Sequence, residues 1–264
     1  MAVAGDLSVT ALYTSQVWVW GGLRGAELLA TADAKRVFDV TNAVLGLARL
    51  ARPDLSPLRY ALLHRHAMID HLLDTAGERS GSVLELAAGL SRRGAANCAS
   101  RRYTEVDLPP VVAKKRELLE RTPEGRAVLE KLTLIAGDVT TIELPSADLA
   151  IAEGLLMYLD GEARRKLFAR ITAPHFIFDL VPQAEEPKPG RVGKLLEAGM
   201  KRFTGGRSFE RDAHTREQIT DELRAAGFTD VRAFSSNEVA AGWELPHPDK
   251  NTTMVVFSAS RATR

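Results

Sequence analysis

The sequence has a single cysteine, Cys98, so no disulfide can form within the chain and no cluster of thiolates can bind a metal. It also lacks an excess of either charge, since 35 basic and 34 acidic residues leave a net charge of +1. Such a balance gives no electrostatic reason to expect a nucleic acid or a membrane surface as partner. No run approaches the roughly 18 apolar residues of a membrane span, and residues 1–6 lack the pattern of a secretory signal. We therefore expect a soluble, cytoplasmic protein.

What is present is an ordinary globular composition, with 45% hydrophobic and 26% charged residues. From residue 80 onward, short apolar runs alternate with helical patterns, which predicts an α/β fold with a doubly wound, mostly parallel seven-stranded sheet. The last two strands are joined without a helix, so we expect them to pair antiparallel. The expected strands are 82–87, 101–107, 132–136, 148–152, 175–181, 229–235 and 253–259, and helices are expected from 109 and over 162–171 and 215–226.

The segment before residue 79 is predicted to be helical. One helix is marked by apolar residues at helical spacing and ends before Pro53, and a second starts at Ser56 and stops at Gly77. The apolar stripe of the first helix is Val37, Val40, Val44 and Leu47. We interpret residues 1–78 as an N-terminal helical cap and residues 79–264 as the α/β domain, with a lid insertion at 183–210.

Acidic side chains follow four successive strands of the predicted sheet. They are Glu85 in the run Glu-Leu-Ala-Ala-Gly, then Asp107, Asp138 and Glu153. In open sheets of this kind, ligands bind beyond the carboxyl ends of the strands. The turn after the first strand fits the dinucleotide fingerprint poorly, and an acid before it suits a cationic amine better than a phosphate. Taken one at a time, these residues could equally be ordinary turn or surface acids.

Arg65 is the most informative single residue, because it falls on the apolar stripe of its helix, between Leu62 and Ile69. A guanidinium on a buried face is costly unless an anion meets it. One hypothesis is therefore that Arg65 binds an anionic ligand. The alternative is that it reaches past the stripe to water or pairs with Asp70.

Two other kinds of site are less well supported. His64, His66 and His71 do not have the spacing of a zinc motif, so we expect no metal. Ser91 lies in a run one residue too long for the nucleophile elbow of ester hydrolases, which leaves a hydrolase as a weak alternative.

Taken together, these motifs resemble the S-adenosylmethionine-dependent methyltransferases of the leucine carboxyl methyltransferase superfamily, most closely the bacterial branch associated with polyketide O-methylation. The resemblance covers roughly residues 8–260 and implies a class I methyltransferase fold. It rests on the following segments: residues 10–14 with Trp18, residues 65–70, residues 85–89, residues 103–110 with Lys114 and Lys115, residues 137–138, and residues 152–158.

The resemblance implies S-adenosyl-L-methionine as cofactor and assigns roles to the residues above. Arg65 would bind the methionyl carboxylate, and Glu85, the Ala87–Gly89 backbone and Glu153 would line the methionine part. Asp107, with Leu108 beside it, would hold the ribose, and Asp138 and Val139 would hold the adenine.

The expected reaction is O-methylation of a small natural-product-type acceptor in secondary metabolism. A carboxylate acceptor is already ionised and needs no base, whereas a hydroxyl needs one. The candidates for that base are Tyr13, Tyr158 and His214. The competing interpretation is a non-catalytic protein of the same fold that binds the cofactor or a partner. Both the acceptor and the oligomeric state are left open by the sequence.

Overall fold

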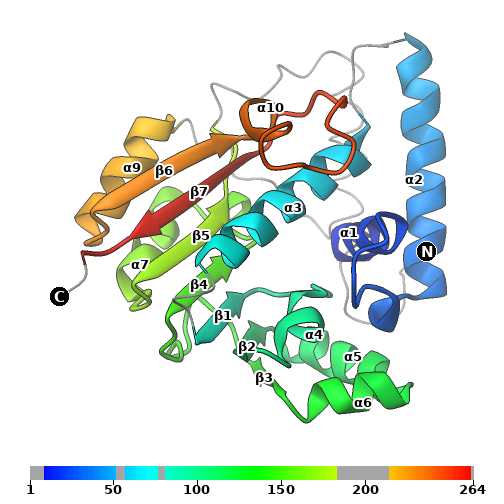
Figure 1. The fold of residues 1–264 in the computed structure, drawn as a ribbon, viewed down its shortest axis with the longest axis horizontal. Coiled ribbons are helices and arrows are strands. Elements are labelled where there is room, and N and C mark those ends of the chain that lie inside the picture. The colour runs from blue at the N-terminus through cyan, green and yellow to red at the C-terminus, as the bar shows by residue number, and fades with distance from the viewer. Residues whose placement is uncertain (1–8, 52–56, 77–80, 183–213, 263–264) are drawn as a thin grey trace.

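A seven-stranded mixed sheet forms the centre of the molecule, with strand order β3-β2-β1-β4-β5-β7-β6 (Figure 1). The computed structural model describes residues 9–51, 57–76, 81–182 and 214–262. Strands β1 to β5 run parallel, and β7 is antiparallel to both β5 and β6. The strands are β1 Ser82–Leu86, β2 Arg102–Asp107, β3 Leu132–Ala136, β4 Leu149–Ala152, β5 His175–Asp179, β6 Asp230–Ser235 and β7 Val255–Ser260.

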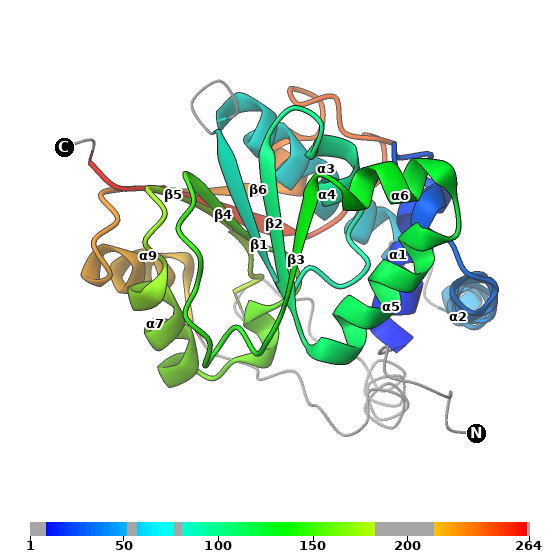
Figure 2. The ribbon, with the colours of Figure 1, turned by 90° about the horizontal axis from the view of Figure 1, so that it is seen from below.

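Helices cover both faces of this sheet (Figure 2). One buried cluster joins the sheet to α7 (Gly161–Arg170) and α9 (Arg216–Ala225). A second cluster, on the opposite face, joins it to α3 (Leu58–Ala76) and α5 (Pro109–Glu120). The other helical segments are α1 Val9–Trp20, η1 Glu27–Leu29, α2 Ala32–Ala51, α4 Arg93–Asn97, α6 Pro123–Leu129, η2 Leu156–Tyr158 and α10 Ser236–Val239. Helices α1 and α2 lie beyond α3 at one side of the molecule (Figure 1).

The alternation of side chains along the strands decides which face each acid meets. Val83, Ile151 and Ile177 belong to the cluster beneath α3, whereas their even-numbered neighbours pack beneath α7 and α9. Because the side-chain period of a strand is two, Glu85 and Asp179 continue the odd-numbered series toward α3. Glu85 and Asp179 are thus directed at the helix that carries Arg65.

The predicted fold is confirmed, including the order of elements and the antiparallel pairing of the last two strands. Helices α1, α4, α6 and α10 and the short segments η1 and η2 were not predicted. Helix α10 lies between the last two strands, which were expected to be joined without a helix. The stripe of α2 is largely exposed, with Val40 59% and Leu47 70% accessible. The lid insertion at 183–210 and the expected helix ends at Ser56 and Gly77 lie outside the described residues. The division between residues 78 and 79 stays a prediction.

No helix in the described ranges has the length and apolar character needed to cross a lipid bilayer.

We predict that Phe257→Ala will lower the free energy of unfolding by about 3–5 kcal/mol, the usual result of emptying a phenylalanine site in a core. Phe257 is fully buried and its ring stacks on Phe178 with centroids 5.0 Å apart. Urea denaturation measures the change. Val40→Ala, on the exposed stripe of α2, is the control and should change stability by less than about 0.5 kcal/mol. A similar small loss for Phe257→Ala would contradict the packing described here.

Candidate functional site

Arg65 lies at the carboxyl ends of β4 and β5, where two carboxylates meet its guanidinium. Its Nε donates to Glu153 Oε1 at 2.9 Å, and its Nη1 donates to Asp179 Oδ2 at 3.3 Å. The side chain is only 7% exposed. Burial alone would lower the pKa of Arg65, but Asp179 and Glu153 reverse this effect and raise it. The predicted location of Arg65 on a buried face is confirmed, and the alternative pairing with Asp70 is wrong.

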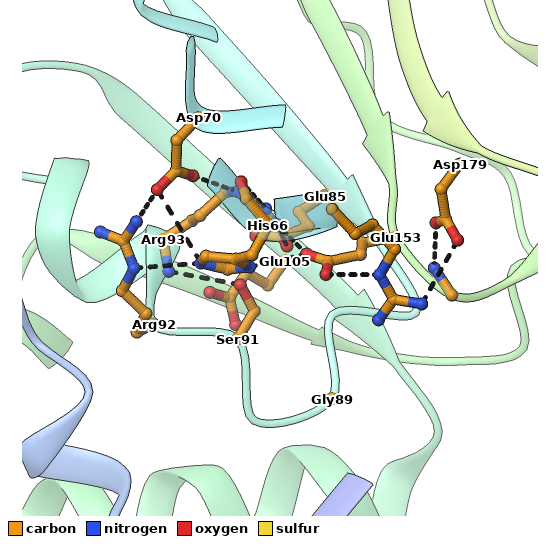
Figure 3. Close-up of polar contacts among 12 residues, drawn as sticks. His66, Asp70, Glu85, Gly89, Ser91, Arg92, Arg93, Glu105, Glu153 and Asp179 are labelled. Atoms are coloured by element: carbon orange, nitrogen blue, oxygen red, sulfur yellow. Dashed lines mark hydrogen bonds and ion pairs between the residues drawn. The ribbon is translucent and has the colours of Figure 1, made fainter. Parts of the chain in front are cut away.

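Glu153 is the centre of a network of buried charges, because three basic side chains converge on its carboxylate. Oε1 accepts from Arg65, while Oε2 lies 2.8 Å from His66 Nδ1 and 2.6 Å from Arg93 Nη1 (Figure 3). Burial would raise the pKa of Glu153, yet Arg93, His66 and Arg65 hold it well below its usual value. The carboxylate is therefore charged over the whole physiological range.

His66 is buried and neutral, and its partners indicate the tautomer. Nε2 accepts from Arg92 Nε at 3.1 Å, whereas Nδ1 lies 2.8 Å from both Glu153 Oε2 and Arg93 Nη2. The acceptor role of Nε2 assigns the ring proton to Nδ1 and its hydrogen bond to Glu153. Trp18 covers the ring at a centroid distance of 4.5 Å. A second proton would place a charge between the guanidinium groups of Arg92 and Arg93. Burial first, and then Arg93, lower the pKa of His66 to about 3.

Arg93 is fully buried and joins three elements of the site (Figure 3). Besides Glu153, its guanidinium contacts Asp70 Oδ1 at 2.7 Å and Glu85 Oε1 at 3.0 Å. The other oxygen of Glu85 accepts from the Tyr103 hydroxyl at 2.7 Å. Glu85 is predicted to line the methionine part of a cofactor, but both of its carboxylate oxygens bond to protein side chains.

The turn after β1 is held in place by Asp107 at the end of β2. Asp107 Oδ2 accepts from the Gly89 amide at 2.6 Å, and Oδ1 accepts from the Leu108 amide at 2.7 Å. Ala87 and Gly89 both have positive φ, 50° and 54°. A Cβ built on Gly89 would meet no atom within 4 Å, so this turn borders open space. Burial raises the pKa of Asp107, although the two amides oppose the rise.

A second buried ion pair, between Lys115 and Glu105, also helps to hold this turn in place. Glu105 is paired with Glu85 across β1 and β2, so each of the two carboxylates needs its own cation. Arg93 serves Glu85, and Lys115 of α5 serves Glu105. Lys115 Nζ also donates to the Ser91 carbonyl at 2.6 Å. Burial raises the pKa of the Glu105 carboxyl, although the Lys115 ammonium opposes the rise.

Asp138 follows β3 and lies next to Asp107, because the Gly137 amide donates to the Asp107 carbonyl at 2.8 Å. Asp138 is exposed, and its Oδ1 accepts from the amide and the hydroxyl of Thr140. Val139 is buried, and its carbonyl accepts from Arg170 at 2.9 Å. The predicted cofactor residues thus lie along the adjacent carboxyl ends of β3, β2, β1 and β4.

The three predicted base candidates lie in different elements. Tyr13, in α1, donates to Asn42 at 3.1 Å, and burial raises its pKa to about 12. Tyr158 is half-buried at the end of η2, five residues after Glu153. His214 precedes α9 and pairs with Glu222 at 3.3 Å; burial and Arg164 lower its pKa. Their catalytic roles stay predictions.

The remaining histidines of α3 have structural partners. His64 contacts the Thr252 hydroxyl at 2.8 Å and the Pro246 carbonyl at 2.7 Å, and His71 stacks on Trp243. Within the part of the chain that the structure describes, no group of three potential ligands could hold a metal ion.

Sequence reasoning missed Asp179, His66 and Arg93 as members of the site. Asp179 had a signal, since it is the one charged residue in the apolar run 176–181 and ends the fifth strand. Arg93 gave no comparable signal, because its partners are Asp70, Glu85 and Glu153 and only the fold brings these together.

We predict that His66 makes the chain less stable in acid. An unfolded histidine binds a proton below about pH 6.5, whereas folded His66 resists protonation down to about pH 3. Between these values the unfolded state holds the extra proton, so this contribution is complete above pH 6.5 and is lost as the pH falls. The loss between pH 7 and pH 5 is about 2 kcal/mol of unfolding free energy.

Urea unfolding of the wild type and His66→Gln at both pH values measures this loss. The pH dependence of the variant should be shallower by about the same amount. Equal pH dependence would mean that His66 carries a proton in the folded chain.

Several solved structures share this fold at low sequence identity. A candidate O-methyltransferase from Nostoc punctiforme PCC 73102 has a TM-score of 0.52 and 17% identity; the match covers 77% of this chain and 60% of that one. The glycopeptide N-methyltransferase MtfA has a TM-score of 0.52 and 23% identity, over 77% of this chain and 92% of its own. The structure of PigF with SAH has a TM-score of 0.53 and 17% identity, and the match covers 96% of this chain and 68% of that one.

The sequence itself also matches a family. No curated protein matches it. A family model described as leucine carboxyl methyltransferase, however, matches residues 24–172, more than half of the chain and the part that contains Arg65, Asp107 and Glu153. The chain therefore belongs to the leucine carboxyl methyltransferase family of S-adenosylmethionine-dependent methyltransferases.

Proposed function

We propose that this chain is an O-methyltransferase that acts on a carboxylate, or a hydroxyl, of a small natural-product-type acceptor, in the manner of the bacterial polyketide branch of its family. The observation that carries the proposal is the row of Asp138, Asp107 and Glu153 at the carboxyl ends of β3, β2 and β4, on both sides of β1, with Arg65 bound to Glu153. A zwitterionic ligand with a sulfonium requires one cation for its carboxylate and acids around its positive groups.

The residues present fit such a cofactor. Gly89 borders open space, so a ligand can approach the backbone of the turn. Arg65 Nη2 lies at Gly154, 3.4 Å from where a Cβ would be, and a carboxylate can be received at such a guanidinium edge. Each oxygen of Asp107 accepts one amide and has a second lone pair with which to accept a ribose hydroxyl. Asp138 and Val139 would adjoin the adenine.

When bound, S-adenosylmethionine supplies a methyl group that its sulfonium already activates. The protein's part is then to align the acceptor oxygen and to exclude water. A carboxylate acceptor is ionised at neutral pH, so no general base is required of the site. Burial raises the pKa of Tyr13 to about 12, which makes Tyr13 a poorer base for a hydroxyl acceptor. For a hydroxyl acceptor, Tyr158 and His214 stay the candidates.

We also propose that residues 1–78 act as the cap of the site, since α3 contributes Arg65 and His66 to it and Trp18 of α1 covers the His66 ring. The hydrolase alternative is weakened by the surroundings of Ser91. Its side chain is buried and its hydroxyl accepts from the Arg93 amide at 3.3 Å. A non-catalytic cofactor-binding protein is the remaining alternative.

We predict that Arg65→Gln weakens binding of S-adenosylhomocysteine by about tenfold to several-hundredfold, the scale of losing a charge-assisted contact. Isothermal titration calorimetry measures the affinity. Arg261→Gln is the matched control, because Arg261 is also partly buried, and its guanidinium hydrogen-bonds to the carbonyls of Ala226 and Ile171 and lies over the Phe228 ring, away from the strand ends of the site. Unchanged affinity in Arg65→Gln would remove Arg65 from the cofactor site.

We predict that the chain methylates members of a panel of small carboxylic acids when supplied with S-adenosylmethionine. Mass spectrometry should show a gain of one methyl group, with phenols in the same panel testing the hydroxyl alternative. Binding of S-adenosylhomocysteine with no methylated product from either class would favour the non-catalytic alternative. Labelling of Ser91 by a fluorophosphonate probe would favour the hydrolase.

A further inference from the structure

Arg93 joins three parts of the site, yet none of the proposed cofactor contacts involves it. It begins α4, four residues after Gly89, and its guanidinium reaches Asp70 of α3, Glu85 of β1 and Glu153 after β4. We propose that Arg93 is a positioning residue that ties the turn after β1 to Arg65 through Glu153, and so fixes the two protein surfaces between which the cofactor binds. This inference rests on the proposed function.

The contacts of Glu153 show why its effect on a ligand would be indirect. Its Oε1 bonds to Arg65, and its Oε2 is shared by His66 and Arg93. Oε2 has both acceptor positions taken and only Oε1 keeps one free, so this carboxylate is better suited to orient Arg65 than to follow a ligand ammonium. Arg65 is in turn fixed from its other side by Asp179, whose second oxygen accepts from the Gly154 amide at 2.5 Å. Arg65 is therefore the side chain that meets the ligand, and Glu153 sets its position.

The shape of Arg93 matters as much as its charge. A fully buried guanidinium is costly unless its fork of donors is satisfied. Here Nε and Nη1 meet three carboxylates, while Nη2 donates to the His66 carbonyl at 3.2 Å and lies 2.8 Å from His66 Nδ1. A lysine would keep the charge but has one compact ammonium, which cannot reach these elements at once. Arg93→Lys should thus loosen Glu153 without removing a positive charge.

Arg92 provides a matched control from the adjacent position. It is also buried, and it also pairs with Asp70 and bonds to His66. Its remaining hydrogen bond ends at the Arg24 carbonyl at 3.4 Å, and no described contact joins it to Glu153 or Glu85. Arg92→Lys therefore tests a general loss of a buried guanidinium in the same network.

The pH dependence of cofactor affinity gives a second test of the proposal, because His66 lies beside both Arg93 and Glu153. The charged and titratable groups that face its ring are Arg92 and Arg93 from the turn and α4, Asp70 from its own helix, and Glu153 after β4; Trp18 of α1 covers it. With Arg93→Gln, Glu153 loses a cation and His66 loses the repulsion that keeps it neutral. Protonated His66 can then replace the missing charge beside Glu153, so the variant should regain cofactor affinity in acid.

The experiment is calorimetric titration of S-adenosylhomocysteine into the folded wild type and variants at pH 8 and pH 5.5, with thermal unfolding to confirm that each variant is folded. The wild type should bind with less than about a twofold change between the two pH values. Arg93→Lys should bind about tenfold more weakly, and Arg92→Lys within about threefold of the wild type. Arg93→Gln should bind at least about threefold more tightly at pH 5.5 than at pH 8, and adding His66→Gln should abolish that gain.

The outcomes separate this inference from the proposed function. Absence of binding by the wild type would overturn both. Normal binding by Arg93→Lys, equal losses in Arg92→Lys and Arg93→Lys, or a pH-independent Arg93→Gln would overturn the positioning role alone. If the Arg93 variants do not fold, His66→Phe decides the matter, because phenylalanine fills the ring site without a change of charge but cannot donate to Glu153. It should weaken binding by about threefold or more at pH 8, and unchanged affinity would overturn the proposal.

Discussion

The constraint on which the rest of the structure depends is the burial of acidic side chains in the centre of a sheet. Glu85 and Glu105 are direct neighbours on β1 and β2, and like charges in that position destabilise a sheet unless each is neutralised. Arg93 and Lys115 neutralise them, and both cations come from segments that flank the turn after β1. These two ion pairs therefore help to hold the turn in place, in addition to the hydrogen bonds that Asp107 accepts from the Gly89 and Leu108 amides.

The need to neutralise buried charges also links the turn after β1 to Arg65. Arg93 satisfies Glu85 and Glu153 together, Glu153 orients Arg65, and Asp179 holds Arg65 from the other side. Each of these buried charges would be costly alone, and removing one leaves its partners unpaired. If Arg65 binds the cofactor as proposed, this network sets the position of its guanidinium before binding, which lowers the entropy lost when the complex forms.

The fold could be predicted from the sequence because strand and helix periodicities are local signals, and those from residue 82 onward are strong. Asp107, Asp138 and Glu153 could be predicted to lie along one edge of the sheet because parallel strands bring their carboxyl ends to that edge. The partners of Arg65 could not be predicted, since they depend on which face of α3 meets which strand. Nothing in the residues 91–94 indicates that Arg93 points inward, and nothing in the period of α2 indicates that Val40 and Leu47 stay exposed.

Ala87 carries a consequence for how related proteins are recognised. Its φ of 50° lies in the left-handed region that glycine adopts without strain, so the backbone turns as a glycine-rich loop would although a methyl group is present. A search pattern that demands glycine at this point would discard the chain, whereas one that asks for any small residue able to adopt that angle would retain it.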